Sequence, residues 1–361
     1  MLDRFLPEFL KREPRLSRDR RRAIWAITHC RTPALGGSRY ACDSCSTQHF
    51  AFHSCNHKAC PRCGRAATAK WVEGMLGKRV NAPYFLVTFT VPQELRSRFF
   101  GSSAKEAYDL FFAAASAALA EKLATAKGLR AQVNGFIAVL HTWGQQMQFH
   151  PHIHFLVPGA GINAKGKVVT VRKADYLVHL PLLKGAFKEH FKKRMIERGW
   201  NEDPAVWRKD WGVHIEAVGS GAEAVKYLGN YVSRSVISDS RIVNIDKENV
   251  TFRWCDRSDK KRMKTKTVSG VDFVRDYLRH VLPTGLRAIR YYGFCHPAAK
   301  KNRERIKMHT GTLIFIGPRP VAAETPPPAC PRCEKPMRLV ERIARCPMSR
   351  APPGIPVLRF S

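Results

Sequence analysis

The chain has 361 residues, enough for two or three domains, and its hydrophobic fraction of 44% is ordinary for a globular protein. Its charge is unusual, because 62 Lys and Arg residues stand against 29 acidic residues and give a formal net charge of +33. Such a charge favours a polyanionic partner, usually nucleic acid. The sequence shows no long apolar run, no basic amphipathic anchor and no signal peptide, which argues against a membrane protein and predicts a cytoplasmic one.

The first 80 residues are rich in cysteine. Six of the eleven cysteines lie between Cys30 and Cys63. In a reducing compartment, such clusters are more often metal ligands than disulfides. Two CxxC pairs predict a structural Zn²⁺ site with four thiolates, Cys42, Cys45, Cys60 and Cys63. Other residues of this stretch are possible additional zinc ligands, although their looser spacing favours an ordinary structural role; these are Cys30, Cys55 and His57.

The middle of the chain alternates between the patterns of strands and helices. In chain order we expect helix 70–78, strand 83–92, helix 105–127, strands 136–143 and 149–157, helix 183–198, strand 213–218, helix 222–232, strand 250–254 and helix 271–280. This order suggests an α+β domain with an antiparallel sheet. We divide the chain into a zinc-binding segment 1–80, a main domain 81–300 and a basic, Pro-rich tail 301–361.

Three histidines alternate along one predicted strand, in the run from His150 through His152 to His154. Because strand side chains alternate between faces, the three imidazoles share one side, while Ile153 and Phe155 take the other. Neutral imidazoles at adjacent positions of one face suit a divalent metal. We interpret the run as a metal-binding strand; the alternative is a merely structural strand.

Two tyrosines, Tyr227 and Tyr231, lie one turn apart on the predicted helix 222–232. Taken alone, such a pair is more often a packed aromatic stripe than a pair of nucleophiles. A bound metal beside two phenols, however, suits phosphoryl transfer to tyrosine. The tyrosine hypothesis therefore depends on the histidine strand.

Basic residues are concentrated between positions 260 and 266, among them Lys261, Arg262 and Lys264. Such a run is usually a solvated loop, but in a chain of this charge it is also a candidate phosphate-contacting segment. Near the carboxyl end, Cys330, Cys333 and Cys346 supply three quarters of a zinc ribbon. Since position 349, where a fourth ligand would be expected, is a serine, we expect a degenerate or non-binding segment.

Taken together, these motifs resemble the rolling-circle transposases of the insertion sequence 91 family, within the HUH endonuclease class. The resemblance runs from about residue 30 to about residue 294. It is carried by the sequence of residues 30–37, both CxxC pairs, the strand 84–92, the stretch from His141, the core 150–154, the segment 227–241 and the segments 280–283 and 290–294. The family usually has His directly before its Cys-Pro-x-Cys element, where this chain has Ala59, so His57 is a candidate replacement.

The resemblance implies an HUH-like antiparallel sheet with flanking helices, preceded by a small zinc-binding domain. It implies that His152 and His154 hold Mg²⁺ or Mn²⁺ with a third, polar ligand. Gln145 is our candidate for that ligand, and Gln146 and His150 remain open. It also implies that Tyr227 and Tyr231 attack DNA to give 5′-phosphotyrosine. The candidate DNA contacts are Arg234, Arg241, Lys261, Arg262 and Lys264.

The expected function is therefore that of a transposase acting on single-stranded DNA at the nucleoid of a prokaryotic cell. Two alternatives remain open. One is a plasmid rolling-circle replication initiator or relaxase with the same chemistry. The other is a non-catalytic zinc-ribbon DNA-binding protein. The amino-terminal cysteine segment argues against the first alternative, and the presence of the histidines with both tyrosines argues against the second.

Overall fold

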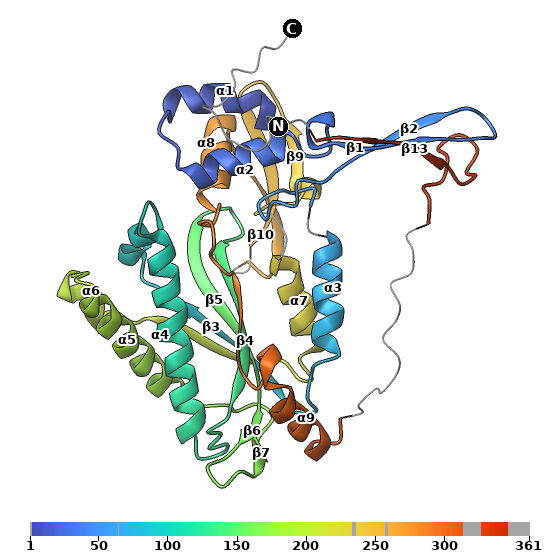
Figure 1. Cartoon of the computed structure of the whole chain (residues 1–361). Coiled ribbons are helices and arrows are strands. Elements are labelled where there is room, and N and C mark those ends of the chain that lie inside the picture. The colour runs from blue at the N-terminus through green and yellow to red at the C-terminus, as the bar shows by residue number, and fades with distance from the viewer. Residues whose placement is uncertain (1, 64, 233–235, 257–258, 313–325, 346–361) are drawn as a thin grey trace.

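The structure, a computed structural model, describes residues 2–63, 65–232, 236–256, 259–312 and 326–345 (Figure 1). At its centre is a five-stranded sheet in the order β12-β4-β5-β3-β8, in which every neighbouring pair is antiparallel. Its strands are β3 (Tyr84–Thr90), β4 (Gly135–Trp143), β5 (Phe149–Pro158), β8 (Gly212–Ala217) and β12 (Ile289–Gly293). The expected α+β class with an antiparallel sheet is confirmed.

One face of this sheet is covered by α4 (Ala104–Thr125) and α5 (Leu180–Glu197), with α6 (Pro204–Arg208) and the 3-10 helix η2 (Gln93–Phe99) beside them (Figure 1). Alternate residues of the central strands supply the core here, including Phe89, Ile153 and Phe155, all fully buried. Burial of each such side chain stabilises the fold by about 1.5–3 kcal/mol. Because Ile153 and Phe155 face this core, the histidines between and beside them face the opposite side.

The opposite face is covered by α3 (Arg65–Leu76), α7 (Ala222–Val232) and α9 (Lys300–His309), together with the hairpin of β6 (Ala160–Ile162) and β7 (Val168–Thr170). Helices α3 and α7 pack very closely. A Cβ atom added to Gly229 would lie 2.3 Å from Cγ2 of Val72, so only glycine fits at this contact. This close packing holds α7 between α3 and the sheet.

A third unit joins the amino-terminal helices to the segment between residues 242 and 279. Helices α1 (Leu2–Arg12) and α2 (Arg18–Thr28) share a core with α8 (Gly270–Arg279) and with the sheet of β9 (Ile242–Ile245), β10 (Asn249–Asp256) and β11 (Arg262–Ser269). Phe5, Phe9 and Phe273 are buried in this core. The divisions at residues 80 and 300 stay a prediction, but the first segment packs against elements some 250 residues later in the chain.

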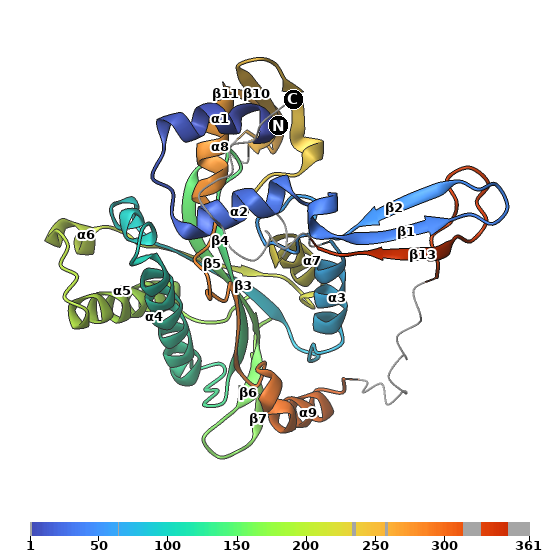
Figure 2. The same cartoon turned by 45° about the horizontal axis from the view of Figure 1, so that its top comes forward.

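A three-stranded arm extends from the body of the molecule (Figures 1 and 2). It contains β1 (Gly37–Ala41), β2 (Gln48–Phe52) and, from the other end of the chain, β13 (Arg338–Ile343), in the order β13-β1-β2. The remaining short 3-10 helices are η1 (Pro33–Leu35), η3 (Asp239–Arg241) and η4 (Pro297–Ala299). No helix within the described ranges is long and apolar enough to span a bilayer.

The helices and strands expected between residues 70 and 280 are present, with ends that differ by a few residues. One expectation is wrong: most of the basic run is a strand rather than a loop. Residues 262–269 form β11, which pairs along its length with β10. Three β-branched residues within it, Thr265, Thr267 and Val268, favour an extended backbone, and pairing with β10 outweighs the effect of the charged side chains.

Candidate active site and metal centres

Three histidines meet on the face of the central sheet that α7 covers. His152 and His154 alternate along β5, and His141 on β4 pairs directly with His152 in the strand register. The ring centroid of His141 lies 5.0 Å from that of His152 and 4.5 Å from that of His154. One ring nitrogen from each residue lies within 4.8 Å of the others. Pairing across two strands thus converts an alternating run into a triangle of nitrogen atoms.

Hydrogen bonds orient two of these rings. Nδ1 of His152 lies 2.7 Å from the carbonyl oxygen of His150, which can only accept, so Nδ1 of His152 carries the proton. Nδ1 of His154 lies 2.8 Å from the hydroxyl oxygen of Thr88 on β3, a group that can also accept. With Nδ1 protonated, Nε2 of each ring keeps its lone pair. This tautomer is the one that metal-binding histidines commonly adopt through an outer hydrogen bond.

The third ring, that of His141, is almost completely buried. Burial lowers the pKa of His141 well below its usual value, and the neighbouring His154 and His152 lower it further. His141 is therefore neutral at pH 7, which is the form of histidine that binds a metal.

The structure adds a residue that the sequence analysis did not name as a ligand, because His141 lies in the cluster. Gln145 lies in the turn between β4 and β5, and its role as the third ligand stays a prediction. His150 is also outside the cluster; its Nδ1 lies 3.0 Å from a guanidinium nitrogen of Arg96. Sequence spacing alone does not give this position, because counting back from the pair of Trp143 with Phe149 places residue 141 opposite residue 151, and an irregularity of the register between His141 and Trp143 moves His141 opposite His152.

Helix α7 brings a phenol to this cluster. Tyr227 is half-buried, and its ring centroid lies 6.0 Å from that of His154 with the two planes nearly perpendicular. Tyr231 follows four residues later in the same helix, and its side chain lies outside the described part of the structure. Arg234 also lies outside the described residues.

The residues of the cluster fit a divalent metal. Three imidazoles converge from two paired strands, with one ring nitrogen of each within 4.8 Å of the others. Nitrogen ligands suit transition metals better than Mg²⁺, which prefers oxygen, so among the two ions expected this donor set favours Mn²⁺.

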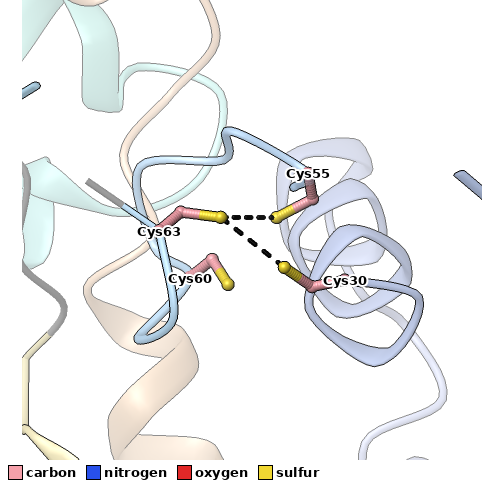
Figure 3. Close-up of side chains that lie close together, drawn as sticks. All are labelled: Cys30, Cys55, Cys60 and Cys63. Atoms are coloured by element: carbon pink, nitrogen blue, oxygen red, sulfur yellow. Dashed lines mark hydrogen bonds between the residues drawn. The ribbon is translucent and has the colours of Figure 1, made fainter. Parts of the chain in front are cut away.

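The cysteines are grouped differently from the expected set of Cys42, Cys45, Cys60 and Cys63, so that grouping is wrong. One cluster contains Cys30, Cys55, Cys60 and Cys63 (Figure 3). The other contains Cys42, Cys45, Cys330 and Cys333. The physical reason is the length of the β1-β2 hairpin: the first CxxC pair lies in its turn, at the far end of the arm, whereas the second lies at the base of the arm beside α2 (Figure 2).

The cluster at the base of the arm has the geometry of a metal site. The sulfur atom of Cys63 lies 3.5 Å from that of Cys30 and 3.6 Å from that of Cys55 (Figure 3). A disulfide requires about 2.0 Å, whereas four sulfur atoms bound tetrahedrally at about 2.3 Å from zinc stand roughly 3.8 Å apart. Hydrogen bonding, chiefly from Cys55, lowers the pKa of Cys60 to about 5 and so favours its thiolate.

Histidine 57 is not part of this cluster. Its Nδ1 accepts a hydrogen bond from the backbone N–H of Ala59 at 3.1 Å. Because four sulfur atoms already converge without it, Ala59 at the position where the family resemblance implied histidine does not leave the cluster short of a ligand. The carbonyl of Ala59 accepts a hydrogen bond from Tyr277 on α8, which fastens the loop to the neighbouring core.

Comparison with known proteins places this arrangement in a family. Residues 135–303 match a family model described as "Putative transposase", and residues 1–91 match one described as "Transposase zinc-binding domain". A protein of Sinorhizobium fredii (strain NBRC 101917 / NGR234) named "Putative transposase y4qJ" is 37% identical over 300 residues, covering 77% of this chain and 75% of the relative. The chain belongs to the insertion sequence 91 family of transposases.

A second relative of this transposase is the "Transposase for insertion sequence element IS801" of Pseudomonas savastanoi pv. phaseolicola. It is 28% identical over 304 residues, which cover 78% of this chain and 72% of the relative. No solved structure matches the chain. The first family model includes all three clustered histidines and α7, and the second includes the cysteine cluster at the base of the arm but not Cys330 and Cys333.

The basic residues expected to contact DNA are not equally available in this transposase. Arg241 donates to the carbonyl of Gln145 at 2.5 Å and to that of Arg253 at 2.8 Å, so it braces the β4-β5 turn against β10. Lys264 pairs with Asp256 and Asp259, which raise its pKa. Lys261 and Arg262 are exposed at the start of β11. DNA is the partner of a transposase. Among these residues, Lys261 and Arg262 are the ones most accessible to it.

Proposed function

We propose that this transposase cleaves and rejoins single-stranded DNA through 5′-phosphotyrosine intermediates in rolling-circle transposition. The observation that carries the proposal is the placement of Tyr227 against the three-histidine cluster, with the Tyr227 and His154 rings 6.0 Å apart. A phenol, a metal-binding triangle and a strongly basic chain are the parts that such a reaction needs.

In the proposed reaction, His141, His152 and His154 would hold a divalent metal. A divalent metal bound there supplies positive charge to the scissile phosphate and to the developing oxyanion. The phenol oxygen of Tyr227 attacks phosphorus, and the bond from phosphorus to the 3′ oxygen breaks. The products are a 5′-phosphotyrosine and a free 3′-hydroxyl, and the proton lost by the phenol is balanced by the one gained at the 3′ oxygen.

Tyr231 is proposed as the second nucleophile. While Tyr227 carries one strand end, Tyr231 can cleave another strand, and the 3′-hydroxyl released by one cleavage can attack the phosphotyrosine formed by the other. Two phenols on one helix therefore permit exchange of donor and target strands without an external energy source. The structure describes the backbone of Tyr231 in α7 but not its side chain. This role therefore rests on the sequence spacing and the family resemblance.

The test is covalent capture of DNA. The full chain is incubated with single-stranded oligonucleotides that carry the ends of its element, in the presence of Mn²⁺. We expect a covalent adduct that disappears on addition of EDTA, and mass spectrometry of the adduct should locate the phosphate on Tyr227 or Tyr231. The double variant Tyr227→Phe/Tyr231→Phe should form no adduct, whereas the exposed Tyr176→Phe serves as the matched control.

Three outcomes would contradict the proposal. An adduct of wild-type strength in the double variant would show that another residue is the nucleophile. Cleavage that persists in EDTA would remove the role of the histidine cluster. Binding without any cleavage would favour the non-catalytic alternative.

A further inference from the structure

The hairpin turn of the arm has a specific backbone conformation. Between β1 and β2, the N–H of Cys42 donates to the carbonyl of Thr47 at 2.9 Å, and the N–H of Ser46 donates to the carbonyl of Cys42 at 2.9 Å. Ser46 adopts a φ of 55°, a left-handed conformation that few residues other than glycine favour. The turn directs the side chains of Cys42 and Cys45 to one side.

The same turn occurs a second time, 288 positions later. The N–H of Cys330 donates to the carbonyl of Lys335 at 2.8 Å, and the N–H of Glu334 donates to the carbonyl of Cys330 at 2.9 Å. Glu334, the residue after Cys333, has a φ of 60°. Each hydrogen bond and the positive φ fall at the same position relative to the CxxC pair as in the hairpin turn. Two equivalent turns thus present two sulfur atoms each.

The two turns face each other at the end of the arm. The sulfur atom of Cys333 lies 3.4 Å from that of Cys42 and 3.6 Å from that of Cys45, and Cys330 lies 3.6 Å from Cys45. These separations are too long for disulfides and close to the roughly 3.8 Å expected between thiolates that share one zinc ion. Four sulfur ligands from two turns match a closed structural site.

Backbone contacts also hold β13 against the hairpin of β1 and β2. Strand β13 pairs with β1 from Gly37 opposite Ile343 to Ala41 opposite Arg338. A Cβ atom on Gly36, whose φ is 69°, would lie 2.6 Å from the carbonyl oxygen of Ile343, so glycine permits this close approach.

Apolar packing in the arm is weak by comparison. The hydrophobic cluster at this sheet has three buried members, Cys42, Cys330 and Met337. The ion pairs from Arg39 to Glu341 and from Arg338 to Asp43 are exposed, and such pairs contribute little. A three-stranded sheet with so small a core needs another source of stability.

We propose that a second zinc ion joins the two ends of the chain, bound by the four sulfur atoms of Cys42, Cys45, Cys330 and Cys333. This site is distinct from the one formed by Cys30, Cys55, Cys60 and Cys63. Its role is to hold β13 on the hairpin of the arm, so that the carboxyl-terminal segment becomes part of the amino-terminal module. It does not depend on the proposed cleavage chemistry.

Zinc content of the purified full chain tests the stoichiometry. We expect two equivalents of zinc in the wild-type chain and one in the double variant Cys330→Ala/Cys333→Ala. The matched control Cys255→Ser removes a cysteine that lies outside both clusters, and it should keep two equivalents. One equivalent in the wild-type chain, or two in the double variant, would overturn the proposal. After exchange with Co²⁺, the thiolate-to-metal absorption of the double variant should fall to about half, because one of two four-thiolate sites is lost.

A cleavage experiment tests the joining role. A recognition site for a specific protease is placed between residues 313 and 325, and the full chain is cut there after purification. We expect the fragment that begins after the cut to stay bound to the rest in zinc-containing buffer and to separate from it when Cys330 and Cys333 are replaced by alanine. Immediate separation of the wild-type fragment would overturn the joining role. A retained circular-dichroism spectrum and one retained zinc in the double variant would show that its body is still folded.

Discussion

The histidine cluster and the cysteine cluster at the end of the arm are supported in opposite ways. The histidines stand on two central strands with a large apolar core on each side of the sheet, including Phe155 on one face and Leu156 on the other. The four cysteines of the arm have almost no apolar core around them. In the first case the fold positions the candidate ligands, whereas in the second a bound metal is expected to hold the strands together.

The cluster of Cys30, Cys55, Cys60 and Cys63 lies between these extremes. Three of its cysteines are buried in the core that α1, α2 and α8 share, so metal and apolar packing support each other there. The comparison predicts a gradation. Loss of a metal should unfold structure at the cysteine clusters. At the histidine cluster it should reduce activity without unfolding the protein.

The largest effect is expected from Cys60→Ser. This change removes one ligand of the buried cluster, and structural zinc contributes on the order of 10 kcal/mol to the folding of small zinc modules. We expect the loss of one zinc equivalent and loss of amide-exchange protection in α1, α2 and α8. Protection of β4 and β5 should persist, because their core is separate. Unchanged protection of α2 in a zinc-deficient variant would show that apolar packing alone supports this region.

The next effect should be confined to chemistry. His154→Ala removes a metal ligand, and since loss of an outer hydrogen bond already costs about 10–100-fold in metal affinity or activity, cleavage should fall by more than about 100-fold. The urea midpoint should change little, because the apolar cores on both faces remain. His190→Ala, at a half-buried position on α5, is the control. Rapid unfolding of the His154 variant would indicate that the cluster is structural.

The sequence predicted the histidine site more completely than the cysteine sites for a physical reason. His152 and His154 lie on one strand, where the period of two assigns their face, and His141 is a hairpin away. The first relation is within one strand, so the strand period reaches it, whereas the second depends on the register between two strands. Gln145 as third ligand stays a prediction, and His141 was not found because the register of β4 against β5 shifts between His141 and Trp143.

The cysteine sites depend on contacts between distant segments. Spacing alone pairs Cys42 and Cys45 with the next CxxC, Cys60 and Cys63, yet the structure pairs them with a segment some 290 residues later. Chain spacing contains no information about which of several CxxC turns meet in space. For the same reason, an incomplete ribbon at Cys330 and Cys333 looked degenerate, although its missing ligands lie at the other end of the chain.

A smaller effect is expected where α8 meets the central sheet. His280, directly after α8, donates from Nε2 to the carbonyl of Met147 at 2.9 Å, and its Nδ1 lies 3.1 Å from the hydroxyl of Thr142 on β4. Burial lowers the pKa of His280 to about 4; Arg279 adds to this decrease, and hydrogen bonding with the backbone of Met147 and Thr142 opposes it. The folded state therefore binds fewer protons than the unfolded state between the folded pKa and the usual value near 6.5.

Stability should consequently decrease as the pH falls through this window. The part due to His280 amounts to about 2 kcal/mol between pH 7 and pH 5. Urea denaturation at both pH values measures it, and His280→Gln should lose this part of the pH dependence while exposed His309→Gln keeps it. An equal pH dependence of stability in all three proteins would show that burial of neutral His280 between α8 and β4 does not contribute to it.

The smallest effect, and the sharpest test of a site made by the fold, concerns Thr88 on β3. Its hydroxyl lies 2.8 Å from Nδ1 of His154, and the two residues are register partners. Thr88→Val keeps the shape and β-propensity of the side chain but removes the hydroxyl that contacts Nδ1 of His154. We expect Mn²⁺ affinity to fall about tenfold, at the low end of outer-ligand effects, with little change in the urea midpoint.

The control is Thr90→Val, at the register partner of His152, whose Nδ1 is already held by the carbonyl of His150. Isothermal titration with Mn²⁺ would measure both variants. A fall in affinity limited to Thr88→Val would show that a strand hydroxyl orients His154, whereas equal affinities would mean that the strands alone fix the ring.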